Sequence, residues 1–335
     1  MTQDKRTGVA LIFGGATANQ LGAAAAALAF PVLGPAGVVA VRQWAAAVLL
    51  LAVGRPRLRS FTARQWRPVL GLAAVFATMN LSLYSAVGRI GLGLAVTLEF
   101  LGPLAVALAG SRRRTDLACA IAAAAAVGIL TRPRPGTDYV GVALALAAAL
   151  CWACYILLNR TVGRRLPGVQ GSAAAAGVSG LLYLPVGIVV FFHHRPTPAA
   201  LGAALAAGVL SSALPFLADL LALRRVPARL FGVFMSVNPV LAALVGEVVL
   251  HQRLDAPAWA AIAVIVAADT VAACRVKGAN AGVVPSGQEV ADGADVGPRV
   301  AVDGDPERRA RTRAGNRCPV PAHGLGDGDA DARRA

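Results

Sequence analysis

Charged side chains are scarce in this 335-residue sequence: they make up 15% of the residues, and aromatic side chains make up 5%. An ordinary soluble protein carries about 25% charged residues and roughly 45–50% apolar ones, whereas 57% of this chain is hydrophobic. A single core has no room for so much apolar side chain, so part of it must face a medium other than water. The composition excludes an ordinary soluble α/β enzyme and indicates a protein embedded in a lipid bilayer.

Several signatures of catalysis and cofactor binding are missing. There is no Gly-rich phosphate loop with its lysine, which argues against a built-in ATPase. The sequence has only four histidines, and His193, His194 and His251 fall in connections between apolar runs. The five cysteines form no disulfide framework, and Cys151 and Cys154 have redox-motif spacing without its βαβ context. We therefore predict no metal, no cofactor and no enzymatic activity.

Long apolar runs dominate what is present. A bilayer core needs about 20 mostly apolar residues per helix, and ten segments qualify, joined by short connections rich in Gly, Pro and Arg. We expect membrane helices at residues 8–29, 35–53, 68–88, 92–110, 116–131, 139–158, 172–192, 199–223, 230–250 and 257–275. The predicted fold class is an all-α membrane protein with ten transmembrane helices.

Basic residues cluster in the connections between these segments, with 24 Lys and Arg against 8 Asp and Glu before residue 278. This distribution is typical of membrane topology and not of a phosphate-binding face, so we expect no nucleic-acid partner. With a cytoplasmic N-terminus, the inside connections hold 18 basic residues and the outside ones hold 5. The positive-inside rule then predicts a multi-pass protein of the cell (inner) membrane with both termini in the cytoplasm.

Residues 278–335 have a different composition, with 8 basic and 9 acidic residues, many Gly and Pro, and few large apolar side chains. Such a segment buries too little apolar surface to offset the entropy of ordering it. We expect a disordered cytoplasmic tail.

The membrane segments repeat weakly along the chain. A shift of 136 residues sets Pro103 on Pro239 and pairs the fourth segment with the ninth. The pattern predicts two five-helix repeats, residues 1–132 and 138–277. Because five is odd, the second copy enters from the opposite side, which gives the inverted repeat found in many secondary transporters.

Ionisable residues inside membrane helices are costly and usually functional. Glu99 lies near the middle of its segment, four residues before Pro103, which leaves the Glu99 carbonyl without its helical partner. A carboxylate there can bind a proton or an ammonium group. Asp219 follows Pro215 by four residues and is a second candidate acid, and Arg42 is a candidate for a substrate carboxylate.

Uncharged polar residues of the same segments are further candidates for a substrate or proton site: Gln20, Asn80, Tyr84, Trp152, Tyr155 and Asn238. The prolines expected to break helices beside this site are Pro103, Pro215 and Pro239. Glu247 and Asp269 lie within one or two turns of a helix end, so we expect their side chains to reach the membrane interface.

Three stretches are similar to a known family: Thr97-Leu-Glu-Phe-Leu-Gly-Pro103, Ser211-Ser-Ala-Leu-Pro-Phe216 and Arg229-Leu-Phe-Gly-Val-Phe-Met-Ser236 with Asn238-Pro239. Together with Leu150-Cys-Trp-Ala-Cys-Tyr155 they resemble the threonine/homoserine exporter branch of the EamA-type drug/metabolite transporters. The likeness covers about residues 8–275.

This resemblance implies ten helices in an inverted five-plus-five repeat and inner-membrane export of small amino acids by proton exchange. It places Glu99, Asp219, Gln20, Asn80, Tyr84, Trp152 and Arg42 where the family carries the same or a similar residue. The sequence departs from the family at His251-Gln252, where Gly-Glu is common, and at Asn238, where an acid is frequent.

The sequence leaves other functions open. The same scaffold serves importers and exporters of other small solutes, such as drugs, purines or nucleotide sugars. A polytopic membrane enzyme is a third hypothesis, although it needs clustered ligands or a nucleophile–base pair that the sequence does not place together. The expected partners are an amino-acid-like small molecule, protons and the lipid bilayer, and no oligomeric state is indicated.

Overall fold

The computed structural model describes residues 3–109, 114–130, 138–167, 169–193, 196–223, 225–226 and 228–275. All regular secondary structure in these ranges is helical. The tail predicted for residues 278–335 lies outside the described residues.

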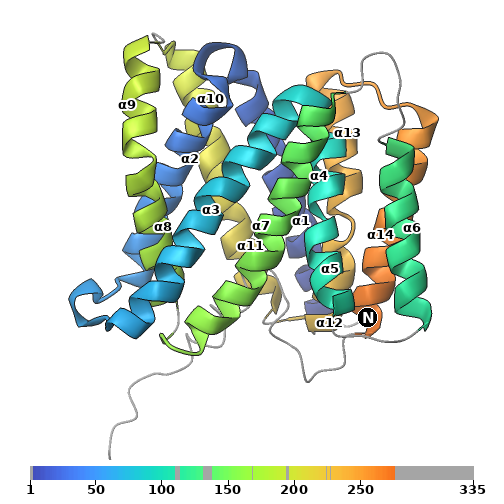
Figure 1. Ribbon diagram of the computed structural model, residues 1–335, viewed down its shortest axis with the longest axis horizontal. Helices are drawn as coiled ribbons and strands as arrows, with labels where there is room; N and C mark the ends of the chain where they lie inside the picture. Colours follow the sequence, from blue (N-terminus) through green and yellow to red (C-terminus); the bar gives the residue numbers. More distant parts are fainter. Residues whose placement is uncertain are drawn as a thin grey trace, which may run out of the picture. The chain divides into compact units, whose positions relative to one another are not determined.

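The chain forms a succession of helices joined by short connections (Figure 1). Their bounds are α1 Gln3–Leu28, α2 Phe30–Gly54, η1 Leu58–Ser60, α3 Ala63–Ile90, α4 Leu92–Glu99, α5 Leu101–Ala109, α6 Arg114–Leu130, α7 Tyr139–Gly163, α8 Gln170–Leu182, α9 Leu184–His193, α10 Pro198–Gly208, η2 Val209–Ala213, α11 Leu214–Leu223, α12 Ala228–Met235, α13 Asn238–Leu250 and α14 Ala256–Arg275.

Seven helical segments within the described ranges are long and apolar enough to cross a bilayer. Three shorter apolar helical segments complete the set, at Thr115–Ile129, Pro198–Ser211 and Val233–Val249. Each of these ten segments overlaps one of the ten predicted from the sequence, so the prediction of an all-helical polytopic protein is confirmed.

Four of the ten segments are interrupted, and each interruption lies two or three residues before a proline. The pairs are Phe100 with Pro103, Tyr183 with Pro185, the π-helical η2 with Pro215, and Val237 with Pro239. Proline lacks the N–H that a helix needs, and its ring clashes with the carbonyl four residues earlier, so the helix kinks or breaks in the turn before the proline. The breaks turn single spans into two half-helices that meet inside the bundle.

The second segment begins five residues earlier than predicted. The prediction starts at residue 35, whereas α2 starts at Phe30 and contains a non-helical Gly34 with φ of +65° directly before Pro35. Glycine tolerates this positive φ at little cost. The predicted boundary therefore marks the start of the straight part of α2.

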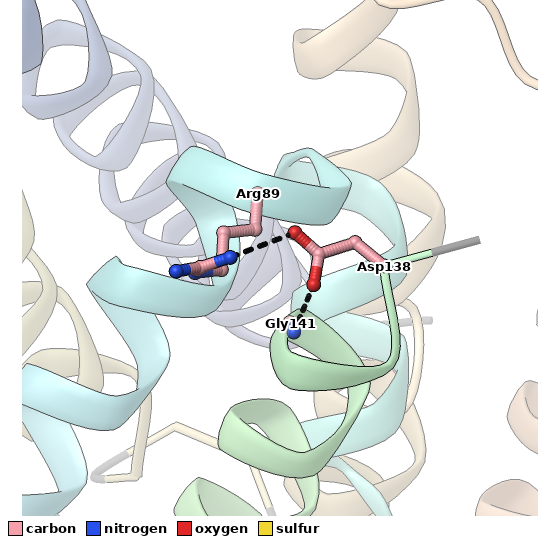
Figure 2. A network of polar contacts seen from close by, with 3 residues as sticks. All are labelled: Arg89, Asp138 and Gly141. Carbon is pink, nitrogen blue, oxygen red and sulfur yellow. Dashed lines mark hydrogen bonds and ion pairs between the residues drawn. The ribbon is translucent and has the colours of Figure 1, made fainter. Parts of the chain in front are cut away.

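Two connections are fixed by polar caps. Thr62 and Gln65 form a capping box at the start of α3, with the Thr62 N–H donating to Gln65 Oε1 at 2.8 Å. Asp138 caps α7 by accepting a hydrogen bond from the Gly141 N–H at 2.9 Å, and it pairs with Arg89 of α3 at 3.0 Å (Figure 2). These caps satisfy N–H groups that the first helical turn leaves free.

Helices distant in sequence pack in pairs: α3 against α7, α1 against α11, α2 against α8, α4 against α13, and α6 against α14. Figure 1 shows α8 and α9 beside α2 at one flank and α6 with α14 at the other. Small residues permit close approach, since a Cβ on Gly102 of α5 would lie 2.2 Å from the Ala149 backbone oxygen of α7. Such close contacts provide the packing that drives helix association in lipid.

Large apolar side chains point outward from many helices. Phe192 is 85% exposed, Val248 72% and Leu150 67%. A water-facing surface rarely carries so many large apolar groups. This exterior matches the hydrocarbon of a bilayer.

Candidate functional site

A cavity of about 290 Å³ lies within the bundle. Its walls come from α1, α2, α3, α4, α7 and α8, and from the helix breaks around η2 and α13. The lining combines apolar and aromatic groups with these polar and amphipathic side chains: Asn19, Gln20, Arg42, Gln43, Asn80, Tyr84, Glu99, Trp152, Tyr155, Ser172, Ser211 and Asn238.

Eight of the nine candidate side chains from the sequence line this one cavity: Gln20, Arg42, Asn80, Tyr84, Glu99, Trp152, Tyr155 and Asn238. The ninth, Asp219, belongs to α11, and its side chain lies outside the described residues. Pro215 also lines the cavity, whereas Pro103 and Pro239 follow the breaks next to Glu99 and Asn238.

Arg42 is held in place by Tyr84. Its Nη1 donates a hydrogen bond to the Tyr84 hydroxyl, and its guanidinium carbon lies 5.0 Å from the centre of the Tyr84 ring. Tyr84 is only 1% exposed, and its ring meets Phe30 edge-on with centroids 6.2 Å apart. The guanidinium of α2 is thus oriented by α3, and its remaining N–H groups are available to an anion.

Glu99 is the last residue of α4 and is 6% exposed. No hydrogen bond to its carboxylate occurs among the described residues. Since Pro103 has no N–H, the Glu99 carbonyl also lacks its helical partner. The carboxylate and the backbone carbonyl of Glu99 are therefore both available as acceptors at the break between α4 and α5, beside the cavity.

Gln20 and Asn238 join α1 to the break between α12 and α13. Gln20 Nε2 donates to Asn238 Oδ1 at 3.1 Å, and Asn238 Nδ2 donates to the Met235 carbonyl at 3.0 Å. Both side chains are buried. This neutral pair holds one wall of the cavity without adding a charge.

Aromatic groups also line the cavity. The rings of Phe100 and Trp152 meet edge-on with centroids 4.9 Å apart, and those of Phe76 and Tyr155 lie 5.9 Å apart. Nearby, Asn80 Nδ2 donates to the Phe76 carbonyl within α3 at 2.8 Å. Trp152 thus packs on the residue that directly follows Glu99 in the chain.

Four polar residues of the lining were not among the candidates from the sequence: Asn19, Gln43, Ser172 and Ser211. Gln43 Nε2 donates to Ser179 Oγ at 2.6 Å, and Ser172 Oγ donates to Asn159 Oδ1 at 3.2 Å. The available signal was an uncharged polar residue inside an apolar run. That signal fits Gln20 and Gln43 equally and does not tell which face of a helix points to the cavity.

The two acids near helix ends differ in exposure. Glu247 of α13 is exposed, but Asp269 of α14 is buried at 7% exposure. The prediction that Asp269 reaches the interface is wrong, because the buried face of α14 packs inside the bundle.

The two ends of the bundle differ around the cavity. Leu50 near the end of α2, and Val169 and Ser172 at the start of α8, line it at one end. At the other end, Leu92 in the first turn of α4 is fully buried, and its N–H donates to Gln252 Oε1 at 2.9 Å. The second end is closed by contact between the α3–α4 and α13–α14 connections.

Next to that closed end, Arg89 and Asp138 form an exposed ion pair (Figure 2). The Gly141 N–H, followed by the Arg89 guanidinium, holds the pKa of the Asp138 carboxyl below its ordinary value. In the described ranges, no group of three or more His, Cys, Asp or Glu side chains is placed to hold a metal ion.

Comparisons with known proteins agree with this architecture. The family model for the EamA-like transporter family matches residues 139–272. The chain is 36% identical over 256 residues to the threonine/homoserine exporter RhtA of Escherichia coli K12, which covers 74% of this chain and 85% of the exporter. The RhtA protein of Salmonella typhimurium LT2 gives the same values.

A crystal structure 21% identical in sequence is similar in fold, with a TM-score of 0.52, and covers 78% of this chain and 96% of its own. The uncharacterized transporter YwfM of Bacillus subtilis is 26% identical over 128 residues, which is 38% of this chain. On the strength of the family model and the 36% identity to RhtA, the chain belongs to the EamA-like transporter family, a family of multi-pass membrane transporters and not of enzymes.

Proposed function

We propose that this protein is a secondary transporter of the cell membrane that exports small amino acids of the threonine or homoserine type in exchange for protons. The observation that carries the proposal is the presentation of one cation and one anion, Arg42 of α2 and Glu99 of α4, to one small cavity. The similarity to threonine/homoserine exporters supports the same substrate class.

A free amino acid carries both charges on adjacent groups, so it needs a partner of each sign within a few ångströms. In this scheme, Arg42 binds the substrate carboxylate through its N–H groups that do not face Tyr84. Glu99 accepts the substrate ammonium, with the freed Glu99 carbonyl as a second acceptor. Burying a charge without a partner is expensive, so the cavity favours zwitterions over neutral solutes or simple ions.

The cavity volume also favours a small substrate. At about 290 Å³ it lies at the lower limit of drug-sized ligand pockets, which span about 300–1,000 Å³. Nucleotide sugars, which are several times larger than threonine, need more room. The aromatic wall of Phe100 and Trp152 leaves apolar contact for a short side chain such as that of threonine.

Coupling follows from competition for one carboxylate. Glu99 binds either a proton or the substrate ammonium, and the two do not occupy it together. Release of the substrate on one side leaves the carboxylate to take up a proton there, which neutralises it for the return step. One substrate then leaves for each proton that enters by this site.

Movement between the two sides is proposed to use an inverted repeat of residues 1–132 and 138–277. The helix contacts support this symmetry. The third segment of the first repeat packs on the first segment of the second (α3 on α7), and the reverse contact is also present (α11 on α1). The pairs α2–α8, α4–α13 and α6–α14 each join corresponding segments of the two repeats. The breaks at Phe100 and at Ser236–Val237 are also 136 residues apart. Rocking of one repeat against the other would open the cavity alternately to each side.

The orientation is part of the proposal. The excess of basic residues in alternate connections supports cytoplasmic termini. The end of the cavity beside Leu50 and Val169 then faces the cytoplasm, and the closed end at Leu92 faces outward. The conformation described here is accordingly assigned to the stage that receives substrate from inside.

The test is transport by the purified full-length protein in proteoliposomes with an acidic lumen and radioactive threonine outside. Glu99→Gln keeps the shape and removes the titrating charge, so gradient-driven threonine uptake should fall to the level of protein-free vesicles. Glu247→Gln makes the same change at an exposed acid outside the cavity and should transport like the wild type.

Full gradient-driven uptake by Glu99→Gln would make the acid structural and refute the mechanism. Failure of the wild type to bind or move any amino acid, with uptake of a purine or a drug instead, would reassign the substrate class while leaving the scaffold unchanged.

A further inference from the structure

Four buried amide side chains line the cavity: Gln20, Gln43, Asn80 and Asn238. In each of them the amide nitrogen donates a hydrogen bond within the protein. The Asn238 oxygen accepts from Gln20, whereas the other three amide oxygens have no partner among the described residues. Buried polar groups in proteins nearly always have a partner, so three oxygens without one at the same cavity point to a ligand.

These three oxygens face the cavity. Gln20 and Gln43 are each 2% exposed, and Asn80 is 4% exposed. In the part of the chain that the structure describes, Asp269 Oδ2 is the one side-chain oxygen or nitrogen that is both fully enclosed and without a partner. The three amide oxygens therefore keep some accessible surface, and the cavity is the open space that their residues line. They are acceptors for N–H or O–H groups of a bound molecule.

Gln43 lies where the two proposed repeats meet. Its Nε2 donates to Ser179 Oγ of α8 at 2.6 Å, and the next residue, Trp44, donates from Nε1 to the Gly180 carbonyl at 3.1 Å. Both hydrogen bonds join positions 136 residues apart, which is the shift that relates the proposed repeats in the sequence. Contacts between equivalent positions lie at the axis that relates two repeats, and transporters built from inverted repeats bind their substrates at the repeat interface. The bond to Ser179 also fixes the plane of the Gln43 amide.

We propose that Gln43 selects amino acids with a side-chain hydroxyl group, whose O–H donates to the Gln43 Oε1 atom while Arg42 binds the substrate carboxylate. This inference rests on the proposed transport of small amino acids and assigns the residue that distinguishes one amino acid from another. Arg42 and Gln43 are neighbours on α2, and both line the cavity. Threonine carries its carboxylate and its hydroxyl on adjacent carbon atoms, so adjacent residues of one helix bind the two groups.

The comparison of threonine with valine isolates this contact. Valine has the shape of threonine with a methyl group in place of the hydroxyl group. When valine fills the cavity, it excludes water from the Gln43 oxygen and leaves this acceptor unpaired. A site that hydrogen-bonds a substrate hydroxyl rejects the analogue without it for this reason. The unpaired acceptor should weaken the binding of valine relative to threonine by at least about tenfold.

The experiment measures how unlabelled threonine and valine displace radioactive threonine from the purified full-length protein, at one pH and without a proton gradient. For the wild type, the ratio of the inhibition constants of valine and threonine should be at least about ten. Gln43→Met keeps the length of the side chain and removes the acceptor, so the ratio should fall to about one. Gln20→Met makes the same change at another amide of the cavity and should keep the wild-type ratio, whatever its effect on affinity.

The outcomes separate this inference from the proposed function. A wild type that binds neither amino acid refutes the proposed function, whereas one that binds threonine and valine equally leaves that function standing and overturns the role of Gln43. A wild-type ratio that survives Gln43→Met also overturns it. Loss of the ratio in Gln20→Met would assign the hydroxyl group to Gln20 and refute the assignment to Gln43.

Two further variants test whether Gln43 acts through packing alone. Ser179→Ala removes the hydrogen bond between α2 and α8 but leaves the Gln43 oxygen in place, so the preference for threonine should remain. Equal loss of the preference in Ser179→Ala and Gln43→Met would make it an effect of packing and refute the proposal. If Gln43→Met does not insert, Gln43→Asn decides. It withdraws the oxygen by one methylene group, so affinity for homoserine, whose hydroxyl lies one carbon farther out, should rise relative to threonine. An unchanged or lower ratio would refute the proposal.

Discussion

The contact between Arg42 and Tyr84 gives a sharp test of how the cavity recognises an anion. Tyr84→Phe removes only the hydroxyl that accepts the Arg42 hydrogen bond. It keeps the ring beneath the guanidinium at 5.0 Å and the edge contact with Phe30 at 6.2 Å. Packing is preserved, so the change isolates the orientation of the guanidinium.

The expected magnitude follows from the hydrogen bond that is lost. A bond to a charged group contributes about 1.5–3 kcal/mol, and water entering the cavity replaces part of it. We expect a loss of about 1.4 kcal/mol in substrate binding, or about a tenfold rise in KM for threonine. The maximal rate should change much less, since the guanidinium still binds the substrate carboxylate in every conformation of the transporter that holds substrate.

Tyr183→Phe is the matched control. The Tyr183 hydroxyl donates to the Ala77 carbonyl at 2.8 Å, and Tyr183 does not line the cavity. Its removal should lower thermal stability in detergent and leave KM unchanged. Equal KM values for Tyr84→Phe and the wild type, or an equal rise in both variants, would refute the assignment of Arg42 as the carboxylate partner oriented by Tyr84.

Three further predictions concern packing, pH and topology. Gly102→Ala should overpack α5 on α7 and reduce the free energy of unfolding by about 1–3 kcal/mol, which a lower melting temperature in detergent would show. Gly128→Ala has open space around it and should not lower the melting temperature. Folding lowers the pKa of Asp138, so this residue stabilises the folded protein fully above its ordinary pKa of 3.8, and the stabilisation is lost as pH falls through the folded pKa. The melting temperature of the wild type should therefore fall with acidification over this pH range. Asp138→Asn should not show this part of the fall. Cysteines introduced at positions 57 and 132 of a cysteine-free variant should label oppositely with an impermeant reagent added outside, and labelling at 57 alone would invert the topology.

The spans were predictable because the bilayer imposes one requirement on every helix. Length and hydropathy suffice to find a segment of about 20 apolar residues. The breaks were predictable only where a proline was linked to a candidate site, as with Pro103, Pro215 and Pro239. The interruption at Tyr183 before Pro185 follows the same rule. It was not predicted because no candidate site residue lies near that proline in the sequence.

The gathering of polar side chains was partly predictable for a similar reason. A polar group such as Asn80 or Glu99 in a membrane helix must avoid lipid, so it turns inward. Which inward position it reaches depends on helix rotation and on packing between distant segments. Gln43 and Ser172 reach the cavity through the pairing of α2 with α8, and Asp269 is buried away from it against α6. Neither result follows from one helix considered alone.

At both positions where the sequence departs from the family pattern, the side chain still forms a hydrogen bond. Where an acid is frequent, Asn238 forms a neutral amide pair with Gln20. Where Gly-Glu is common, His251 takes a left-handed conformation with φ of +53°, and the Gln252 amide oxygen accepts the Leu92 N–H that a carboxylate would accept as well. Hydrogen bonding survives both changes, and only negative charge is lost. Among the cavity-lining side chains that are described, one cation and one anion then remain, Arg42 and Glu99. An acid at position 238 would add a second anion beside Gln20. The asparagine there leaves Glu99 as the single carboxylate that shares the cavity with Arg42, which is the charge pattern on which the proposed binding of a zwitterion rests.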